Sequence, residues 1–172
     1  NLVSGDTNNY GDIFLRDIAN STTSRVSVSS SGIQGNQVSS EPMVSENGLV
    51  VAFQSNASNL APNDTNGATD IFLRDVLSQT TTRVNQTSTG SQTFGNSDSV
   101  SISATAGRVA YRSDATNIVP GVTRSSVYVY DVASGQTICP VQTSEGQYGN
   151  DSSTWPCMSP DGRYVAYTTR ST

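Results

Sequence analysis

Two loops of the sequence combine aspartate and asparagine at a spacing that could bind a metal ion. The motif D-x-N-x-x-x-D has the side chains Asp6, Asn8 and Asp12 in its first copy and Asp64, Asn66 and Asp70 in its second. Calcium takes roughly six to eight oxygen ligands, so each loop would need backbone carbonyls and water to complete a site. Aspartate and asparagine also cap turns by accepting hydrogen bonds from nearby backbone amides. Loop capping is the preferred interpretation, and calcium binding is the alternative.

Three glycine-containing loops carry aromatic and amide side chains that would suit a sugar or a peptide. Aromatic faces and amide donors are common in such sites. Gly-Asn pairs are equally common where a turn needs positive backbone angles, so turn architecture alone also explains them. The candidate ligand-binding residues are Phe94, Asn96, Tyr148, Asn150 and Trp155.

The composition gives little support to catalysis. The chain contains no histidine, which excludes Ser-His-Asp and Cys-His catalytic pairs and imidazole metal sites. A glycosidase needs two carboxylates at a fixed separation, but glutamate occurs only at positions 41, 46 and 145. We expect a non-enzymatic protein with no cofactor other than the calcium considered above. A hydrolase that uses Glu145 or Asp151 is the least favoured alternative.

The charge of the chain argues against two classes of partner. With nine Arg, no Lys and 14 acidic residues, the net charge is −5, so nucleic acid and anionic membrane surfaces are poor partners. No apolar run approaches the length that spans a bilayer. Short runs of Val, Ile, Tyr and Phe indicate β-structure. Their setting of abundant Ser, Thr and Asn indicates a secreted, periplasmic or cell-surface protein.

An internal repeat shows which elements must position these residues. The hexapeptide at residues 12–17 returns unchanged at 70–75, and a related segment occurs at 127–131. Other motifs keep the same steps of 58 and 56 residues. The sequence therefore predicts a single domain of three repeats, which span residues 1–58, 59–116 and 117–172.

Each repeat contains four short segments with the composition of β-strands, separated by turn residues. In the second copy the pair Asn47-Gly48 favours a tight hairpin turn. The four strands of that copy are expected at residues 42–45, 49–54, 70–75 and 80–84. Four antiparallel strands in a repeat of about 57 residues are typical of a β-propeller blade. We therefore predict an all-β fold, a β-propeller with three blade-equivalents per chain.

The register of the repeat places half a blade at each end of the sequence. Residues 163–167 supply the second strand of a blade, whereas residues 12–17 supply the third strand of one. Since a propeller needs at least about four blades to close, we expect two copies to share strands in a six-bladed homodimer. The alternatives are half of a longer six-bladed chain, or copies that fail to close and form a fibre.

The two cysteines, Cys139 and Cys157, are not expected to form a disulfide. Cys139 matches Arg25 and Arg83 on the outermost strand of its blade, whereas Cys157 matches the innermost strand of the next blade. These positions should lie several strand spacings of about 4.8 Å apart, which a disulfide cannot bridge. We expect two buried free thiols.

One segment resembles a known repeat family. The run from Ser159 to Tyr167, SPDGRYVAY, together with the recurring DIFLRD segments, resembles the WD40-like PD40 repeats of TolB-type β-propellers. The resemblance covers all three repeats, although Tyr130 stands in the third where Arg16 and Arg74 stand in the others. It implies a six-bladed or similar propeller, often periplasmic or secreted, that binds proteins or serves as an accessory domain. It implies no shared activity, because one fold hosts many functions.

The combined prediction is a secreted binding module that assembles with itself by sharing strands. Its further partner would be another protein, a peptide or a glycan, and nothing in the sequence names it. The rival interpretation is a structural subunit of an extracellular surface layer or filament, in which the half-blades are the functional surfaces. Discrete dimers favour the first interpretation and long polymers favour the second.

Overall fold

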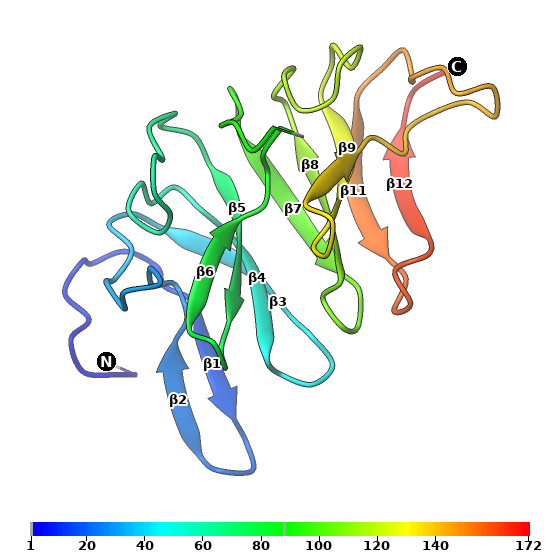
Figure 1. Ribbon diagram of the computed structural model, residues 1–172. Coiled ribbons are helices and arrows are strands. Elements are labelled where there is room, and N and C mark those ends of the chain that lie inside the picture. The colour runs from blue at the N-terminus through cyan, green and yellow to red at the C-terminus, as the bar shows by residue number, and fades with distance from the viewer. Residues whose placement is uncertain (1, 88) are drawn as a thin grey trace.

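The computed structural model describes residues 2–87 and 89–172, which form strands and loops (Figure 1). Four antiparallel sheets lie side by side in a fan that follows the chain from one end to the other. Within the described residues there is no helix, and hence no helical segment that could cross a membrane. The predicted all-β fold is confirmed. The strands are β1 (Phe14–Asp17), β2 (Thr22–Arg25), β3 (Ser39–Val44), β4 (Val50–Ser55), β5 (Asp70–Asp75), β6 (Thr80–Arg83), β7 (Ser97–Ile102), β8 (Arg108–Ser113), β9 (Ser126–Asp131), β10 (Gln136–Ile138), β11 (Ser153–Met158) and β12 (Val165–Thr169).

Two of the sheets are complete and two are half as wide. Strands β3, β4, β5 and β6 form one four-stranded meander, and β7, β8, β9 and β10 form the next. The two-stranded sheets, β1-β2 and β11-β12, lie at the two ends of the fan (Figure 1). We call the four-stranded sheets blades and the two-stranded sheets half-blades. The half-blades occur where the repeat register predicts them.

The hairpin between β3 and β4 is closed by side chains of the turn. The backbone N–H of Val50 donates to Ser45 Oγ at 2.9 Å, and Leu49 N–H donates to Asn47 Oδ1 at 3.0 Å. Gly48 adopts a φ of 71°, which a residue without a β-carbon reaches at no steric cost. The Asn-Gly turn is confirmed.

Strand β3 begins earlier than the sequence predicts, because it contains a β-bulge. Strand β3 starts at Ser39, which pairs with Ser55, and its register shifts between Ser40 and Met43. Pro42, at which the predicted strand began, lies inside the bulge. Proline has no N–H to give to a ladder, and a bulge is a place where none is needed.

The core of each blade is built on a pair of aromatic rings from its middle strands. Phe53 of β4 stacks on Phe72 of β5, and Tyr111 of β8 stacks on Tyr128 of β9, with ring centroids 5.8 Å apart in both pairs. All four side chains are fully buried. A ring pair at this position is therefore the repeating unit of core packing.

Hydrogen bonds between neighbouring sheets hold the fan together near its hairpins. Glu46 N–H donates to the carbonyl of Ala104, and Ala104 N–H donates to the carbonyl of Pro160, each at 2.8 Å. Met158 N–H donates to Ser101 Oγ at 2.9 Å. Consecutive sheets are thus joined through equivalent turns.

Both cysteines are free, but only one is buried. Cys139 is 2% exposed, whereas Cys157 is exposed, so the prediction of two buried thiols is wrong for Cys157. Cys157 lies on β11, the first strand of the last half-blade, and no further sheet among the described residues packs beyond it.

Candidate functional site

The second of the candidate calcium loops places two carboxylates against a buried arginine. Arg83 Nη1 lies 3.2 Å from Asp64 Oδ1 and 3.3 Å from Asp70 Oδ2. The three side chains are 6%, 4% and 0% exposed, respectively. Asn85 also donates to Asp70 from within the cluster, at 2.5 Å. The guanidinium supplies the positive charge that two buried carboxylates require.

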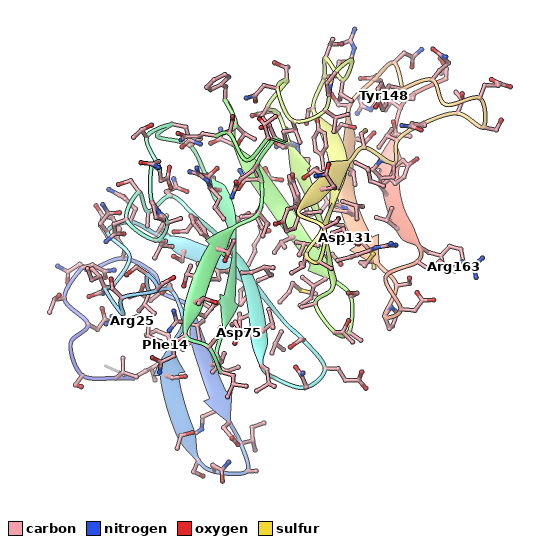
Figure 2. All side chains as sticks on the ribbon, in the orientation of Figure 1. Phe14, Arg25, Asp75, Asp131, Tyr148 and Arg163 are labelled. Atoms are coloured by element: carbon pink, nitrogen blue, oxygen red, sulfur yellow. The ribbon has the colours of Figure 1, made fainter. Side chains whose placement is uncertain are left out.

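The first loop repeats this arrangement nearer to solvent. Arg25 Nη1 lies 3.4 Å from Asp6 Oδ1 and 3.3 Å from Asp12 Oδ2. Gln34 Nε2 donates to both aspartates, at 3.0 and 3.1 Å. In Figure 2 Arg25 lies beside the N-terminal loop that carries these acids.

The asparagines of both loops act as caps. Asn66 Oδ1 accepts the backbone N–H of Ala68 at 3.0 Å, and its amide donates to Asp70 at 3.2 Å. Asn8 Oδ1 accepts the N–H of Tyr10 at 2.9 Å in the same way. Across residues 2–87 and 89–172, no group of three or more acidic, cysteine or histidine side chains is arranged to hold a metal ion. These contacts support the loop-capping interpretation.

The acidic motif does not by itself reveal Arg25 or Arg83, because each arginine lies 13 residues after the last aspartate of its motif, on another strand. The repeat does contain a signal, since both copies with the acidic motif also have the arginine. The third repeat lacks the motif and the arginine, because Ser126 and Cys139 occupy the positions of Asp70 and Arg83. There Ser126 Oγ lies 3.3 Å from Cys139 Sγ, and Val122 is buried at the position of Asp64. The buried ionic cluster has thus been replaced as a unit.

Asp64 makes the stability of the blade formed by β3, β4, β5 and β6 depend on pH. Burial and the neighbouring carboxylate of Asp70 raise the pKa of Asp64 from its usual 3.8 to about 6, against the opposing effect of Arg83. Between about pH 4 and pH 6 the folded protein therefore retains a proton that the unfolded chain has released. Stability contributed by this group is present at low pH and is lost as the pH rises through that range.

We expect Asp64→Asn to gain stability relative to the unmodified protein as the pH rises from about 4 to about 7.5. The neutral amide resembles the protonated acid and has no proton to lose. Urea denaturation of both proteins at the two pH values measures the change. A stability difference that is equal at both values would contradict the prediction.

The five predicted ligand-binding residues do not form one site. Phe94 is 80% exposed on its loop, and Trp155 is 73% exposed on β11. Asn96 anchors its loop, because its Oδ1 accepts the N–H of Thr69 at 2.9 Å. Tyr148 and Asn150 lie together beside the C-terminal loops, where Figure 2 labels Tyr148, and line a cavity of about 300 Å³.

Asn150 is also occupied within the chain. Its amide donates to the carbonyl of Thr172 at 3.3 Å, and its Oδ1 accepts the Thr172 N–H at 3.2 Å. Tyr148 is partly buried and packs against Gly121 and the buried core. The structure therefore brings Tyr148 and Asn150 together, and places Phe94 and Asn96 on a different loop.

The half-blades expose residues whose repeat equivalents are completely buried. On β12, Ala166 is exposed and Tyr167 half-buried, whereas the equivalent Ala52 and Phe53 of β4 are 0% exposed. On β1, Phe14 is half-buried, although its equivalents on β5 and β9 are completely covered. We call the open side of β12 the C-terminal edge and the open side of β1 the N-terminal edge. In the complete blades the equivalent sides of the ladder are covered by a neighbouring strand.

Two solved structures share this arrangement of sheets. One is the tricorn protease, which matches 91% of this chain at 14% identity with a TM-score of 0.56. The other is a putative TolB from Agrobacterium tumefaciens, which matches 92% of the chain at 17% identity with a TM-score of 0.52. Both are β-propeller proteins. The fold is that of a β-propeller. No protein-family model and no curated protein sequence matches the chain.

These likenesses define the propeller fold but not the activity. The chain spans 13% of the tricorn protease chain and 47% of the TolB chain, less than half of each. One of the two is a protease and the other is a TolB protein, so the pair does not distinguish an enzyme from a binding protein.

Proposed function

We propose that this chain is a non-enzymatic, secreted, periplasmic or cell-surface binding module that joins a second copy through its two edges. Two chains would then form a six-bladed propeller with two shared blades. The observation that carries the proposal is the exposure, at both edges, of side chains that are completely buried wherever a blade is complete.

The register inside the complete blades shows how the edges would pair. In the blade formed by β3, β4, β5 and β6, Ala52 lies opposite Leu73 and Phe53 lies opposite Phe72 across the β4-β5 ladder. Ala166 and Leu15 are the repeat equivalents of Ala52 and Leu73, so Ala166 of one copy would lie opposite Leu15 of the second copy. Tyr167 would stack on Phe14 of the second copy, which gives the shared blade the ring pair found in both complete blades.

The turn at the end of the ladder is consistent with the same pairing. Val76 N–H donates to the carbonyl of Leu49 at 2.8 Å, and Val132 N–H donates to the carbonyl of Gly107 at 3.0 Å. The third member of this series would be Ile18 N–H of the second copy donating to the carbonyl of Arg163. The Ile18 side chain is 87% exposed in the single chain.

Symmetry explains why two copies suffice. A two-fold axis brings the N-terminal edge of each chain to the C-terminal edge of the other, so both seams form at once and no edge remains open. Uncovered strand edges with apolar side chains are otherwise sites of aggregation. The same edges would build an open polymer, the surface-layer or filament alternative, if successive arcs did not close.

Light scattering of the 172-residue chain tests the proposal. We expect a single species with twice the 18.1 kDa mass of the chain. Long polymers would favour the structural-subunit alternative over the closed module. A stable monomer at micromolar concentration would overturn the strand-sharing assembly.

A further inference from the structure

Three consecutive sheets carry the same backbone distortion on their first strands. Glu41 on β3, Ser99 on β7 and Trp155 on β11 have φ values of 53°, 56° and 55°, within the left-handed region. Each lies in the β-bulge of its strand, where the register shifts. None of the three is glycine, and such strained positions persist only where the surroundings determine them, often at ligand sites.

One cavity joins the three distorted positions. It has a volume of about 270 Å³, and its lining includes Glu41, Met43, Ser99 and Trp155. Trp155 is 73% and Met43 is 39% exposed, so large apolar surfaces face solvent here instead of the core. The strands that contribute are neighbours in the fan, as the labels β3, β7 and β11 in Figure 1 show. We call this cavity the bulge pocket.

A carboxylate is held in the bulge pocket by the neighbouring sheet. Glu41 Oε2 accepts the backbone N–H of Ser99 at 3.2 Å, a contact that spans two sheets. The nearby Asp98 is already paired with Arg112, at 2.7 Å. Among the described residues Glu41 forms no salt bridge. The pocket therefore combines a carboxylate that no arginine neutralises with an exposed indole.

We propose that the bulge pocket binds the arginine side chain of a peptide or partner protein. A planar guanidinium can stack on the face of an indole and donate hydrogen bonds to a carboxylate at the same time. The methylene stem of the arginine would lie against Met43, since such stems pack on apolar surface while the charged head is bound. The guanidinium would also pair with the Glu41 carboxylate, which is exposed and has no arginine partner among the described residues.

This inference does not depend on the proposed assembly. All residues of the bulge pocket that carry the argument belong to one chain, although Trp155 stands on β11, a strand of the half-blade that the proposed dimer would share. The oligomeric state is measured by mass and the pocket by ligand titration. The failure of either proposal is therefore seen in its own measurement.

The single tryptophan of the chain makes the test direct, because Trp155 is the only source of tryptophan fluorescence. The probe is the blocked tripeptide acetyl-Gly-Arg-Gly-amide, titrated into the unmodified protein. We expect a saturable change in emission. The matching peptide with citrulline, which keeps the shape of arginine without its charge, should bind about ten- to hundredfold more weakly. Equal affinity for the two peptides, or no saturable change with the arginine peptide, would overturn the proposal.

Two carboxylate variants locate the binding group. Glu41→Gln should weaken the arginine peptide by about ten- to hundredfold, whereas Glu145→Gln, on an exposed loop outside the pocket, should leave its affinity unchanged. Thermal unfolding of each variant shows whether the fold is kept. If Glu41→Gln does not fold, the comparison of the two peptides on the unmodified protein still decides. Equal binding to both variants would contradict the assignment of Glu41.

Discussion

Phe14→Asp is expected to convert the proposed dimer into monomers while the single chain stays folded. Phe14 is half-buried in the isolated chain and is not part of its buried core, as Figure 2 places it on the N-terminal half-blade. In the proposed dimer it stacks on Tyr167 of the second copy at both seams. Loss of a buried aromatic side chain costs about 3–5 kcal/mol, and a carboxylate there must also be desolvated. Two such losses would weaken the dimer by several powers of ten.

Phe94→Asp is the matched control for this prediction. It makes the same chemical change at Phe94, which is 80% exposed on the loop before β7 and belongs to neither half-blade. We expect this variant to keep the mass of the unmodified protein. Phe14→Tyr should also keep that mass, since the blade formed by β7, β8, β9 and β10 uses tyrosine in both members of its ring pair. A Phe14→Asp protein that retains twice the chain mass, measured by light scattering, would show that the edges do not pair as proposed.

The repeat made the strands predictable, because turn residues and ring positions recur in every copy. Asn47-Gly48 closes the hairpin that it predicts, and DIFLRD forms strand β5 over its predicted range of 70–75. The bulge was not predictable from composition, because a proline at position 42 suggests the start of a strand. In the structure the bulge accommodates Pro42, and strand β3 runs through it. Pro42 does mark a change in the strand, but only the pairing of β3 with β4 shows that this change is a bulge and not a strand end.

The candidate site was predicted less well, because side chains distant in sequence complete it. The sequence favours loop capping by the acidic loops and leaves calcium as the alternative, but it does not predict the arginine that the structure places against each loop from the following strand. Trp155 was singled out as an aromatic in a loop, but it lies in the bulge of β11 and shares a pocket with residues of β3 and β7. Periodicity locates strands, but it does not show which side chains of successive sheets meet.

Arg83→Met is expected to have the largest effect on the stability of the single chain. Removal of the guanidinium leaves Asp64 and Asp70 facing each other in the interior, and Asp70 has no exposed surface. Breaking a buried ion pair on one side costs about 3–5 kcal/mol, which corresponds to a fall of roughly 10 °C in melting temperature for a domain of this size. Differential scanning calorimetry at neutral pH measures the loss. Arg124→Met, which removes an exposed arginine, should change stability by no more than about 0.5 kcal/mol.

The third repeat supplies a stronger test of the same explanation. There Val122, Ser126 and Cys139 fill the positions of the two acids and the arginine without any buried charge. Apolar replacement of a whole buried ion cluster is often neutral or stabilising. We therefore expect the combined variant Asp64→Val, Asp70→Ser, Arg83→Cys to recover most of the stability that Arg83→Met loses. If the combined variant were as unstable as Arg83→Met, the loss would come from the volume of the arginine and not from the charges left without a partner.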